Sequence, residues 1–497
     1  MNMKSALRLG VITLSISGLV KADQTKSFGI TEDNLLKMVK ESNPSLDEIE
    51  ASFLDSKIQA KQVEDNMGYE FYSGYTHNHT KEKPLIVFQP VFSNVNQYKI
   101  GVKKYTKYGV VLDAHRSIDT RSSDDTYTDL TTTTDELGIQ MDLWRDFMGK
   151  VTRAQLSNAR SMRKKDQLQA EISKNALTVN VRKLYWSIVA NDEKLKITKN
   201  LYSAAQKQAK NARKRAANSI TDKAEVARFE SLVHARKGAI LSLEYEREML
   251  IKNLREIFPQ LNLKDISLAK VNFNKTIFEV LACTTQIDQQ KKVPFEHTSY
   301  DEVINLLKGI QNNQYKVDNS YDSVDLKFDL KLKRIGVASE TSDGSNYSGD
   351  YEKSIKDMQD NDRGAMSAGL LLTVPFGENR GGTAKIKKAL TERRFRSNMQ
   401  KLETNVVSTH HQVKRSVKLL SHVITEQKQN SKQLAIRVKE MKKKYSQARI
   451  PEYALIQDED SLLQSDLNIV DTQLLVVTTI LDYISVFNTF PCTFNRN

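Results

Sequence analysis

Few side chains in this sequence are spaced in a way that would let them bind a metal ion or act as a catalytic base. His77 and His79, in the stretch YTHNHT, could both contact one metal ion, but no third or fourth ligand is in view. His410 and His411 are adjacent in a helical stretch and equally isolated. No glycine-rich phosphate loop, zinc-protease motif or nucleophile elbow occurs. The sequence therefore predicts no catalysis, no cofactor and no metal site.

Charged residues with a regular spacing lie in the stretch SVDLKFDLKLKRIGVAS, which begins at Ser323. Apolar and charged residues alternate up to Lys333, the pattern of a strand with one apolar and one charged face. In membrane barrels such strands turn their apolar face to lipid and their polar face to a wet lumen. The alternation breaks at Arg334. We predict that these side chains face a lumen: Asp325, Lys327, Asp329, Lys331 and Lys333.

Three other stretches are strand-like: GYEFYSGYT from Gly68, ELGIQMDLW from Glu136 and GAMSAGLLLTV from Gly364. Four strands cannot close a barrel, because small barrels need about eight. If these strands enter a membrane, several chains must therefore share one barrel.

Composition indicates a mainly helical protein. Of 497 residues, 27% are charged, and only 19 are glycine and 8 proline, which favours long exposed helices. The net charge of +14 fits basic helix faces, with a nucleic acid or an anionic membrane surface as alternatives. No aromatic residues are interleaved with the basic runs as a stacking platform for nucleic acid.

The beginning of the chain has the pattern of a secretory signal. Lys4 and Arg8 precede an apolar run from Leu9 to Val20, and Ala22 fits a cleavage site before Asp23. No later run of 18 apolar residues predicts a membrane helix. An exported chain of this kind is either soluble or enters a membrane as strands.

The sequence contains two copies of one unit. A shift of 230 residues pairs Ala154 with Ala384 and Leu232 with Leu462, whereas upstream the shift is 268. The first copy therefore holds 38 extra residues (268 − 230), within 81–122. We interpret them as longer strands or an outer loop, with an added hairpin as the alternative. Each copy begins with an amphipathic helix, near 31–67 and 299–322, and continues with strands, a very long helix, a turn and a second helix.

The long helices carry heptad seams, from Leu177 to Ala216 and from Val413 to Tyr445. A helix from about residue 150 to 215 would be on the order of 100 Å long and needs antiparallel neighbours to bury its seam. Asn218 is suited to the left-handed conformation of a tight turn, and Pro451 to the first turn of the following helix. The basic runs 213–215 and 442–444 either stabilise helix C-termini or form a collar that docks an acidic partner.

Four ordered stretches resemble the TolC family of outer-membrane efflux proteins: NPSLDEIEASFLDSKIQAKQVED, LWRDFMGKVTRAQLSNAR, LTVPFGENRGGTAKIKKAL and YSQARIPEYALIQDEDSLLQSDLNIVDTQ. The resemblance covers about residues 31–488. It implies long antiparallel helices that form an α-barrel, and a β-barrel of twelve strands, four from each chain of a homotrimer. The barrel would lie in the outer membrane of a Gram-negative bacterium and the helical tunnel in the periplasm.

The resemblance also implies partners and a passive role. A periplasmic adaptor and an inner-membrane pump would deliver cargo, in drug or metal efflux or in type I secretion, and nucleic acid would not be involved. The alternative is a periplasmic coiled-coil scaffold without a channel. Candidate adaptor contacts at the turns are Asn218, Ser219, Ile220, Ala448, Arg449, Ile450 and Pro451.

The sequence departs from the family at the tunnel aperture. The two acidic gating positions of the family align with Ala454 and Gln457, with other acidic residues nearby. The candidate aperture residues are Asp222, Glu225, Glu452, Ala454, Gln457 and Asp458.

The expected domain organisation follows from the two copies. Residues 1–22 form the signal peptide, 23–258 the first repeat (strands about 68–145, long helices about 150–258), 259–298 an equatorial linker, 299–488 the second repeat (strands about 324–374, long helices about 383–488), and 489–497 a tail. The only two cysteines, Cys283 and Cys492, both fall near the expected middle of the tube. They either form a disulfide there or stay as separate thiols.

Overall fold

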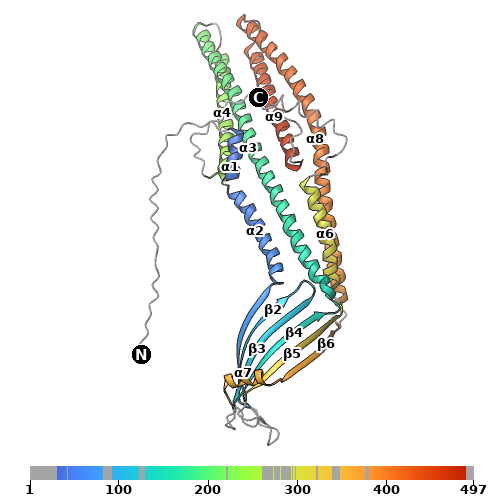
Figure 1. The fold of residues 1–497 in the computed structure, drawn as a ribbon. Coiled ribbons are helices and arrows are strands. Elements are labelled where there is room, and N and C mark those ends of the chain that lie inside the picture. Colours follow the sequence, from blue (N-terminus) through green and yellow to red (C-terminus); the bar gives the residue numbers. More distant parts are fainter. Residues whose placement is uncertain are drawn as a thin grey trace, which may run out of the picture.

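The computed structural model describes residues 31–41, 43–81, 92–122, 129–219, 222–259, 273, 280, 293, 295–296, 298–320, 323–338, 348–374 and 380–487. The molecule is elongated, with a bundle of long helices at one end and one curved sheet at the other (Figure 1). The predicted combination of long helices and membrane-type strands is confirmed. The predicted signal peptide and both cysteines lie outside the described residues.

The segment before the first strand forms two helices, α1 (Glu32–Glu41) and α2 (Pro44–Asp65), so the prediction of one helix over 31–67 is wrong. Pro44 has no backbone N–H and disfavours a helical conformation in the residue before it. Asn43 is accordingly extended, and its side chain accepts a hydrogen bond of 2.8 Å from the backbone N–H of Ser45. The break between the two helices is therefore the N-cap of α2.

Two helical hairpins form the long bundle. In the first, α3 (Lys150–Ala217, 68 residues) returns as α4 (Lys223–Ile257). In the second, α8 (Arg380–Ser446) returns as α9 (Glu452–Phe487), and α6 (Ser299–Ser320) packs beside α3 and α8. The seam positions predicted from the heptads are buried at Val181, Ile188, Leu195, Ala205, Ala209 and Ala212 of α3, and at Val413, Val417, Ile424 and Val438 of α8.

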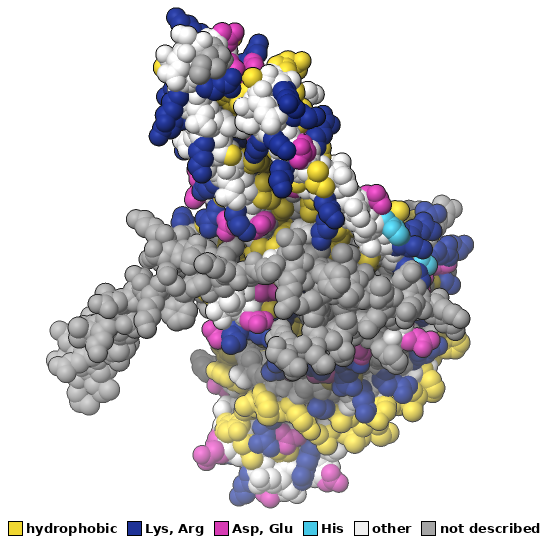
Figure 2. Space-filling model, turned by 90° about the horizontal axis from the view of Figure 1, so that it is seen from above, with side chains coloured by type: hydrophobic (Ala, Val, Ile, Leu, Met, Phe, Trp, Pro, Cys, Tyr) yellow, Lys and Arg dark blue, Asp and Glu magenta, His cyan; other side chains and the backbone are white. Residues whose placement is uncertain are grey.

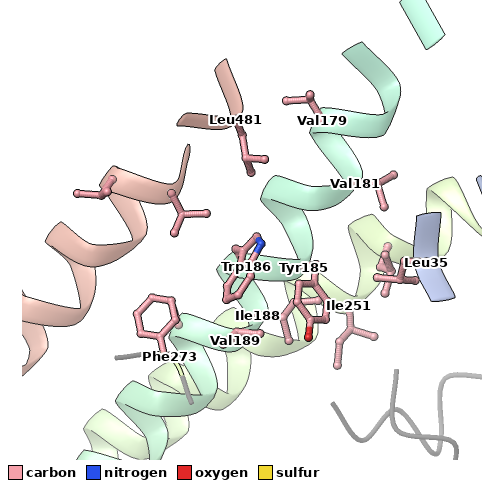
Figure 3. Close-up of a cluster of buried hydrophobic side chains, with 14 of the residues drawn as sticks. Leu35, Val179, Val181, Tyr185, Trp186, Ile188, Val189, Ile251, Phe273 and Leu481 are labelled. Carbon is pink, nitrogen blue, oxygen red and sulfur yellow. The ribbon is translucent and has the colours of Figure 1, made fainter. Parts of the chain in front are cut away.

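The largest apolar core lies where α1, α3, α4 and α9 meet (Figure 3). Leu35 of α1, Ile251 of α4 and Leu481 of α9 pack around Tyr185 and Trp186 of α3. Burial raises the pKa of Tyr185 to about 12. Each large apolar side chain buried here contributes about 1.5–3 kcal/mol, so this cluster fixes the middle of the bundle.

The helix α9 differs from the other long helices in composition. An 18-residue stretch of it has a mean hydropathy of 1.5, enough by length and composition to cross a membrane. Half of that stretch is buried in the bundle, and α9 packs on α3 and α8. This burial is that of a core helix, although the hydropathy is higher than the sequence analysis suggested.

The six strands of the described residues form one antiparallel sheet in the order of the sequence. They are β1 (Tyr69–His79), β2 (Asn94–Tyr105), β3 (Val110–Ser122), β4 (Leu130–Asp142), β5 (Asp325–Val337) and β6 (Gly364–Thr373). A short helix, η1 (Phe147–Gly149), joins β4 to α3, and α7 (Tyr351–Asp360) lies between β5 and β6. The two halves of the chain thus build one continuous wall.

The extra residues of the first copy form the hairpin β2–β3, so the prediction of longer strands or an outer loop is wrong, as is the count of four strands. The hairpin turns at Gly109, whose φ of +72° favours glycine. Thr106 stabilises the turn, because its hydroxyl oxygen accepts hydrogen bonds from the backbone N–H groups of Tyr108 (3.3 Å) and Val110 (3.2 Å). These hydrogen bonds fix the turn between β2 and β3.

Candidate functional site

The five charged residues predicted to share a face do lie on one face of β5, and they are linked to β4. Glu136 of β4 lies 3.0 Å from the amine of Lys333 and 3.8 Å from that of Lys331. Within β5, Lys327 is 3.3 Å from Asp325, and Lys331 is 3.5 Å from Asp329. Charges of opposite sign alternate from Asp325 to Lys331, and Glu136 of β4 lies beside the two consecutive lysines, Lys331 and Lys333.

The same face is concave and is charged on the neighbouring strands too. His115 of β3 lies 3.1 Å from Asp113 and 3.8 Å from Glu136. Lys99 and Lys103 of β2 join these residues around a groove of about 460 Å³, which Lys327, Asp329 and Lys331 of β5 also line. The hairpin thus extends the charged surface that the sequence predicted only for β5.

The opposite face of the sheet is apolar across all six strands. Strand pairing places one outward-facing residue of each strand in a single row: Phe71, Val102, Ala114, Leu137, Leu332 and Met366. Phe71 is 81% exposed and Met366 is 73% exposed, which would be costly in water. Figure 2 shows an arc of hydrophobic side chains along the sheet with Lys and Arg side chains beside it. The sheet has one face suited to lipid and one suited to water.

Aromatic side chains border the apolar face at both ends. Tyr69, Trp144 and Phe147 are exposed at the end next to the helices, where Trp144 is 64% exposed. Tyr75 and Tyr98, with ring centroids 4.8 Å apart, are exposed towards the other end. Membrane barrels have such aromatic girdles at both water–lipid boundaries. Sequence reasoning missed them, although Tyr69 and Tyr75 are an even number of residues apart in β1 and so place two aromatic rings on one face of the strand.

The height of the sheet fits a bilayer. The strands β3, β4 and β5 have 13 residues each. At 3.3 Å per residue and a tilt of about 40°, such a strand rises about 33 Å, against an apolar band of about 25 Å in outer-membrane barrels.

The helix α7 covers the outer end of the apolar face on β4 and β5. The buried hydroxyls of Ser354 and Thr133 are 2.6 Å apart, and Asp357 accepts a 2.8 Å hydrogen bond from the backbone of Val337. Gly336 allows the close approach, because a Cβ there would lie 2.0 Å from the backbone oxygen of Ser354. Arg334, where the alternation broke, donates to the carbonyl of Gln359 on α7, so β5 continues beyond the predicted end.

The junction between sheet and bundle is tightly packed. Asp146 accepts hydrogen bonds from the backbone N–H groups of Val151 (2.6 Å) and Thr152 (3.0 Å), which begin α3. Gly149 has φ +71°, and a Cβ there would lie 2.0 Å from the carbonyl oxygen of Lys107 in the β2–β3 turn. The turn of the hairpin therefore rests directly on the start of α3.

At the far end of the bundle, both helical hairpins turn tightly. The residue with positive φ in the first turn is Ser219 (57°), whereas Asn218 has φ −92°, so the assignment of the left-handed residue to Asn218 is wrong. In the second turn it is Ala448 (55°). The backbone N–H of Ala448 donates to Tyr445, and that of Arg449 donates to Lys444, the Schellman pattern. These bonds satisfy the last carbonyls of α8, so no glycine is needed there.

The remaining turn residues flank this pattern. Pro451 lies directly before α9 rather than inside its first turn, with Ile450 ahead of it. Ile220 lies outside the described residues.

Two of the acidic candidates near the tip, Glu225 and Glu452, make contacts between the two helical hairpins. Glu225 of α4, 8% exposed, accepts a hydrogen bond from the hydroxyl of Tyr445 of α8 and lies 3.3 Å from Arg215. Burial, and then the hydrogen bond to Glu225, raise the pKa of Tyr445 well above its usual range. Arg228 of α4 pairs with the buried Glu452 of α9. Glu225 and Glu452 thus each join the first hairpin to the second.

A second layer of pairs follows along α9. Asp458, 2% exposed, is held by Nε and Nη2 of Arg437, at 2.9 and 2.8 Å. Glu459, 3% exposed, lies 2.9 Å from Lys442 and accepts a 2.9 Å hydrogen bond from Gln208 of α3. Arg236 of α4 pairs with Asp460.

The other aperture candidates do not join this layer. Asp222 caps α4 by accepting a 2.8 Å hydrogen bond from the backbone of Glu225. Ala454 and Gln457 are partly or fully exposed on α9.

The basic runs are partly used inside the molecule. Arg213 lies 2.6 Å from Glu230, and Lys442 pairs with Glu459 as described. This fits the interpretation of charges that stabilise helix ends, while the collar stays a hypothesis. His77 and His79 each contact an asparagine of β2, and no metal-binding cluster occurs within the described residues.

The geometry has counterparts among solved structures. VceC, an outer-membrane protein of Vibrio cholerae, superposes with a TM-score of 0.63 over 91% of this chain and 95% of its own, at 14% identity. The Campylobacter jejuni outer-membrane channel CmeC gives 0.61 over 98% and 94%, at 13% identity. This chain has the outer-membrane channel fold. The open state of the Neisseria gonorrhoeae channel MtrE gives 0.57 at 12% identity, over 91% of this chain and 88% of that one. The sequence itself matches no protein-family model and no curated protein.

The fold predicted from the TolC resemblance is therefore confirmed. At identities this low the likeness establishes the fold, and what the channel carries and what it binds have to be argued from this chain.

Proposed function

We propose that this protein is an outer-membrane channel that conducts cargo passively out of the periplasm of a Gram-negative bacterium. The observation that carries the proposal is the two-faced sheet: an apolar face bordered by aromatic residues, and a concave charged face, joined to helices of about 100 Å. In water the apolar face would invite aggregation, whereas in a bilayer it is solvated by lipid. The likeness to solved outer-membrane channels supports the same interpretation.

Three copies would form the channel, with the sheets in the membrane and the helical hairpins as the periplasmic tunnel. An inner-membrane pump and a periplasmic adaptor would supply energy and cargo, in efflux or type I secretion. The turns around Ser219 and Ala448 form the free end of the bundle, where an adaptor would dock.

At that end the contacts of Glu225 and Glu452 hold the two hairpins of one chain together. Opening of the tunnel would then require these contacts to loosen. The scaffold without a channel remains the competing function, but it gives no reason for an exposed apolar row across six strands.

Membrane fractionation of an expressing Gram-negative cell tests the proposal. We expect the chain in the outer-membrane fraction, and a detergent-corrected particle mass near three chains. A soluble monomer or dimer would overturn the channel and favour the scaffold.

Two substitutions on adjacent residues of β5 sharpen the test. Leu332→Arg places a charge on the apolar face, where Arg costs about 2–4 kcal/mol at the bilayer midplane, and should abolish outer-membrane assembly. Lys331→Arg keeps the charge on the concave face and should assemble normally. Equal behaviour of the two variants would contradict a membrane role for this sheet.

A further inference from the structure

The number of strands in the sheet points to a barrel of unexpected width. We infer that three copies of this chain close one eighteen-stranded barrel, in which β6 of one copy pairs with β1 of the next and the β2–β3 hairpin is a permanent part of the wall. The inference rests on the proposed function and deepens it, because it names the surface by which the copies join. The family resemblance implied twelve strands.

The hairpin is built into the sheet rather than laid upon it. β2 pairs with β1 from Tyr69–Lys104 to His79–Asn94, and β3 pairs with β4 from Val110–Met141 to Arg121–Leu130. Both faces continue through it, with Ile100 and Leu112 on the apolar side and Lys99 and Lys103 of β2 on the charged side. A hairpin folded outside the wall would have no reason to keep this alternation in phase with four other strands.

A side-chain contact across β2 joins β1 to β3. Tyr72 of β1 reaches over β2 and donates a 2.7 Å hydrogen bond to Asp113 of β3. Its ring lies over Gly101, where a Cβ would be 2.7 Å from the ring and 2.6 Å from the Cβ of His115. Glycine at this position of β2 therefore permits the contact.

The periplasmic end of the hairpin is fixed as well. Its turn packs on Gly149 at the start of α3, and the backbone N–H of Asp142 donates a 3.2 Å hydrogen bond to the carbonyl of Gly109. The hairpin is thereby held to β4 and to the bundle at the same point.

The two edges of the sheet match each other. Within the described residues, β1 pairs only with β2 and β6 only with β5. β1 runs away from the bundle and β6 runs back to it, so the two edges would join as antiparallel neighbours. Both expose apolar residues on the same face, Phe71 on β1 and Leu370 (68% exposed) on β6.

The edge strands β1 and β6 must pair with the strands of a second copy of this chain. Unpaired backbone groups are too costly in lipid, so edges within a bilayer must close. Six strands are too few to close on themselves, since about eight make the smallest barrels. Three six-stranded sheets give eighteen strands and an even, fully antiparallel barrel.

The width follows from strand spacing and tilt. With strands 4.8 Å apart and tilted by about 40°, eighteen strands enclose a backbone diameter of about 36 Å, against about 24 Å for twelve. The hairpin would add Lys99, Lys103, Asp113 and His115 to the lumen wall. The membrane part would then be wide, and the helical tip would set the size limit for cargo.

Electron cryo-microscopy of the full chain in detergent counts the strands directly. Eighteen strands in a trimer would support the inference. A trimer with twelve strands and the hairpin outside the wall would overturn it while leaving the channel function intact. A chain without a barrel would overturn the channel function as well.

Thiol labelling tests independently whether β2 lines the pore. The single-cysteine variants are made in a protein that carries Cys283→Ser and Cys492→Ser. In planar bilayers, a charged, water-soluble methanethiosulfonate should lower the conductance of Lys99→Cys and Lys103→Cys, whose side chains face the groove. Ile100→Cys and Val102→Cys on the same strand should not respond, because they face outward. Equal responses, or none, at all four positions would show that β2 does not line the pore.

Discussion

Tyr445, in the last turn of α8, donates a hydrogen bond to Glu225, in the first turn of α4, and so ties one helical hairpin to the other. Arg215 lies 3.3 Å from the same carboxylate, and the Arg228–Glu452 pair repeats the connection nearby. The contact joins elements 220 residues apart in sequence. It is placed where the tunnel would have to widen.

Removal of that hydroxyl should favour the open tip. A hydrogen bond to a charged carboxylate contributes about 1.5–3 kcal/mol, so Tyr445→Phe should raise the ratio of open to closed channels by about tenfold or more. Single-channel recording in planar bilayers measures the ratio. Tyr453→Phe is the matched control, because Tyr453 is 59% exposed at the start of α9. An unchanged ratio in Tyr445→Phe would show that the contact is structural only.

Much of the bundle could be predicted, because a heptad seam is local information. Positions such as Val181 and Ala209 follow from spacing along one helix, and the alternation from Asp325 to Lys333 fixed both faces of β5 in the same way. The break at Asn43–Pro44 also had a local signal, and the prediction of one continuous helix overlooked it.

The hairpin and the tip contacts could not be predicted in this way. The extra length within 81–122 was detected from the repeats. Whether these residues form an added hairpin, lengthen the existing strands or form an outer loop depends on which strands they pair with, and the local sequence does not record that. Gly109 and Thr106 form a turn that matters only because β1 and β4 accept the two new strands. The Tyr445–Glu225 contact likewise depends on how two hairpins pack, which no spacing within either one records.

His410 should make the bundle sensitive to acid. It is 2% exposed on α8, packed against Tyr483 and Phe487 of α9, and burial lowers its pKa below the usual 6.5, with His411 and Lys414 adding to the effect. The folded state therefore prefers neutral His410, while the unfolded chain takes up a proton near pH 6.5. Stability from this group is complete above pH 6.5 and is lost as the pH falls towards the lowered value.

Thermal unfolding in detergent between pH 8 and pH 5 measures this dependence. We expect a drop in the unfolding temperature of the unaltered chain on acidification, and a smaller drop in His410→Leu. His422→Leu serves as the control, because His422 is exposed on the same helix. The same drop in all three proteins would mean that His410 does not carry the effect.

Gly101 should be required for the wall, unlike Gly74 on the neighbouring strand. A Cβ at Gly101 would lie within 2.7 Å of Tyr72 and His115, whereas a Cβ at Gly74 meets nothing within 4 Å. Gly101→Ala should therefore displace Tyr72, break its hydrogen bond to Asp113 and lower the yield of assembled trimer. Gly74→Ala should assemble normally. The comparison is made by heat-resistance of the trimer on gels, and equal resistance would argue against close packing of β2 between β1 and β3.

Gly149 should be the more sensitive of two glycines at the strand-to-helix junctions. It has φ +71°, and a Cβ would lie 2.0 Å from the carbonyl oxygen of Lys107, so Gly149→Ala combines backbone strain of about 1–2 kcal/mol with a backbone clash. Gly382, near the start of α8, has nothing within 4 Å of a Cβ, and Gly382→Ala should be neutral or stabilising by up to about 1 kcal/mol. Chemical unfolding should thus show a lower midpoint for Gly149→Ala and an unchanged or higher midpoint for Gly382→Ala. If Gly149→Ala leaves the midpoint unchanged, the hairpin turn does not rest on the start of α3, and the wall would not be fixed to the bundle at this point.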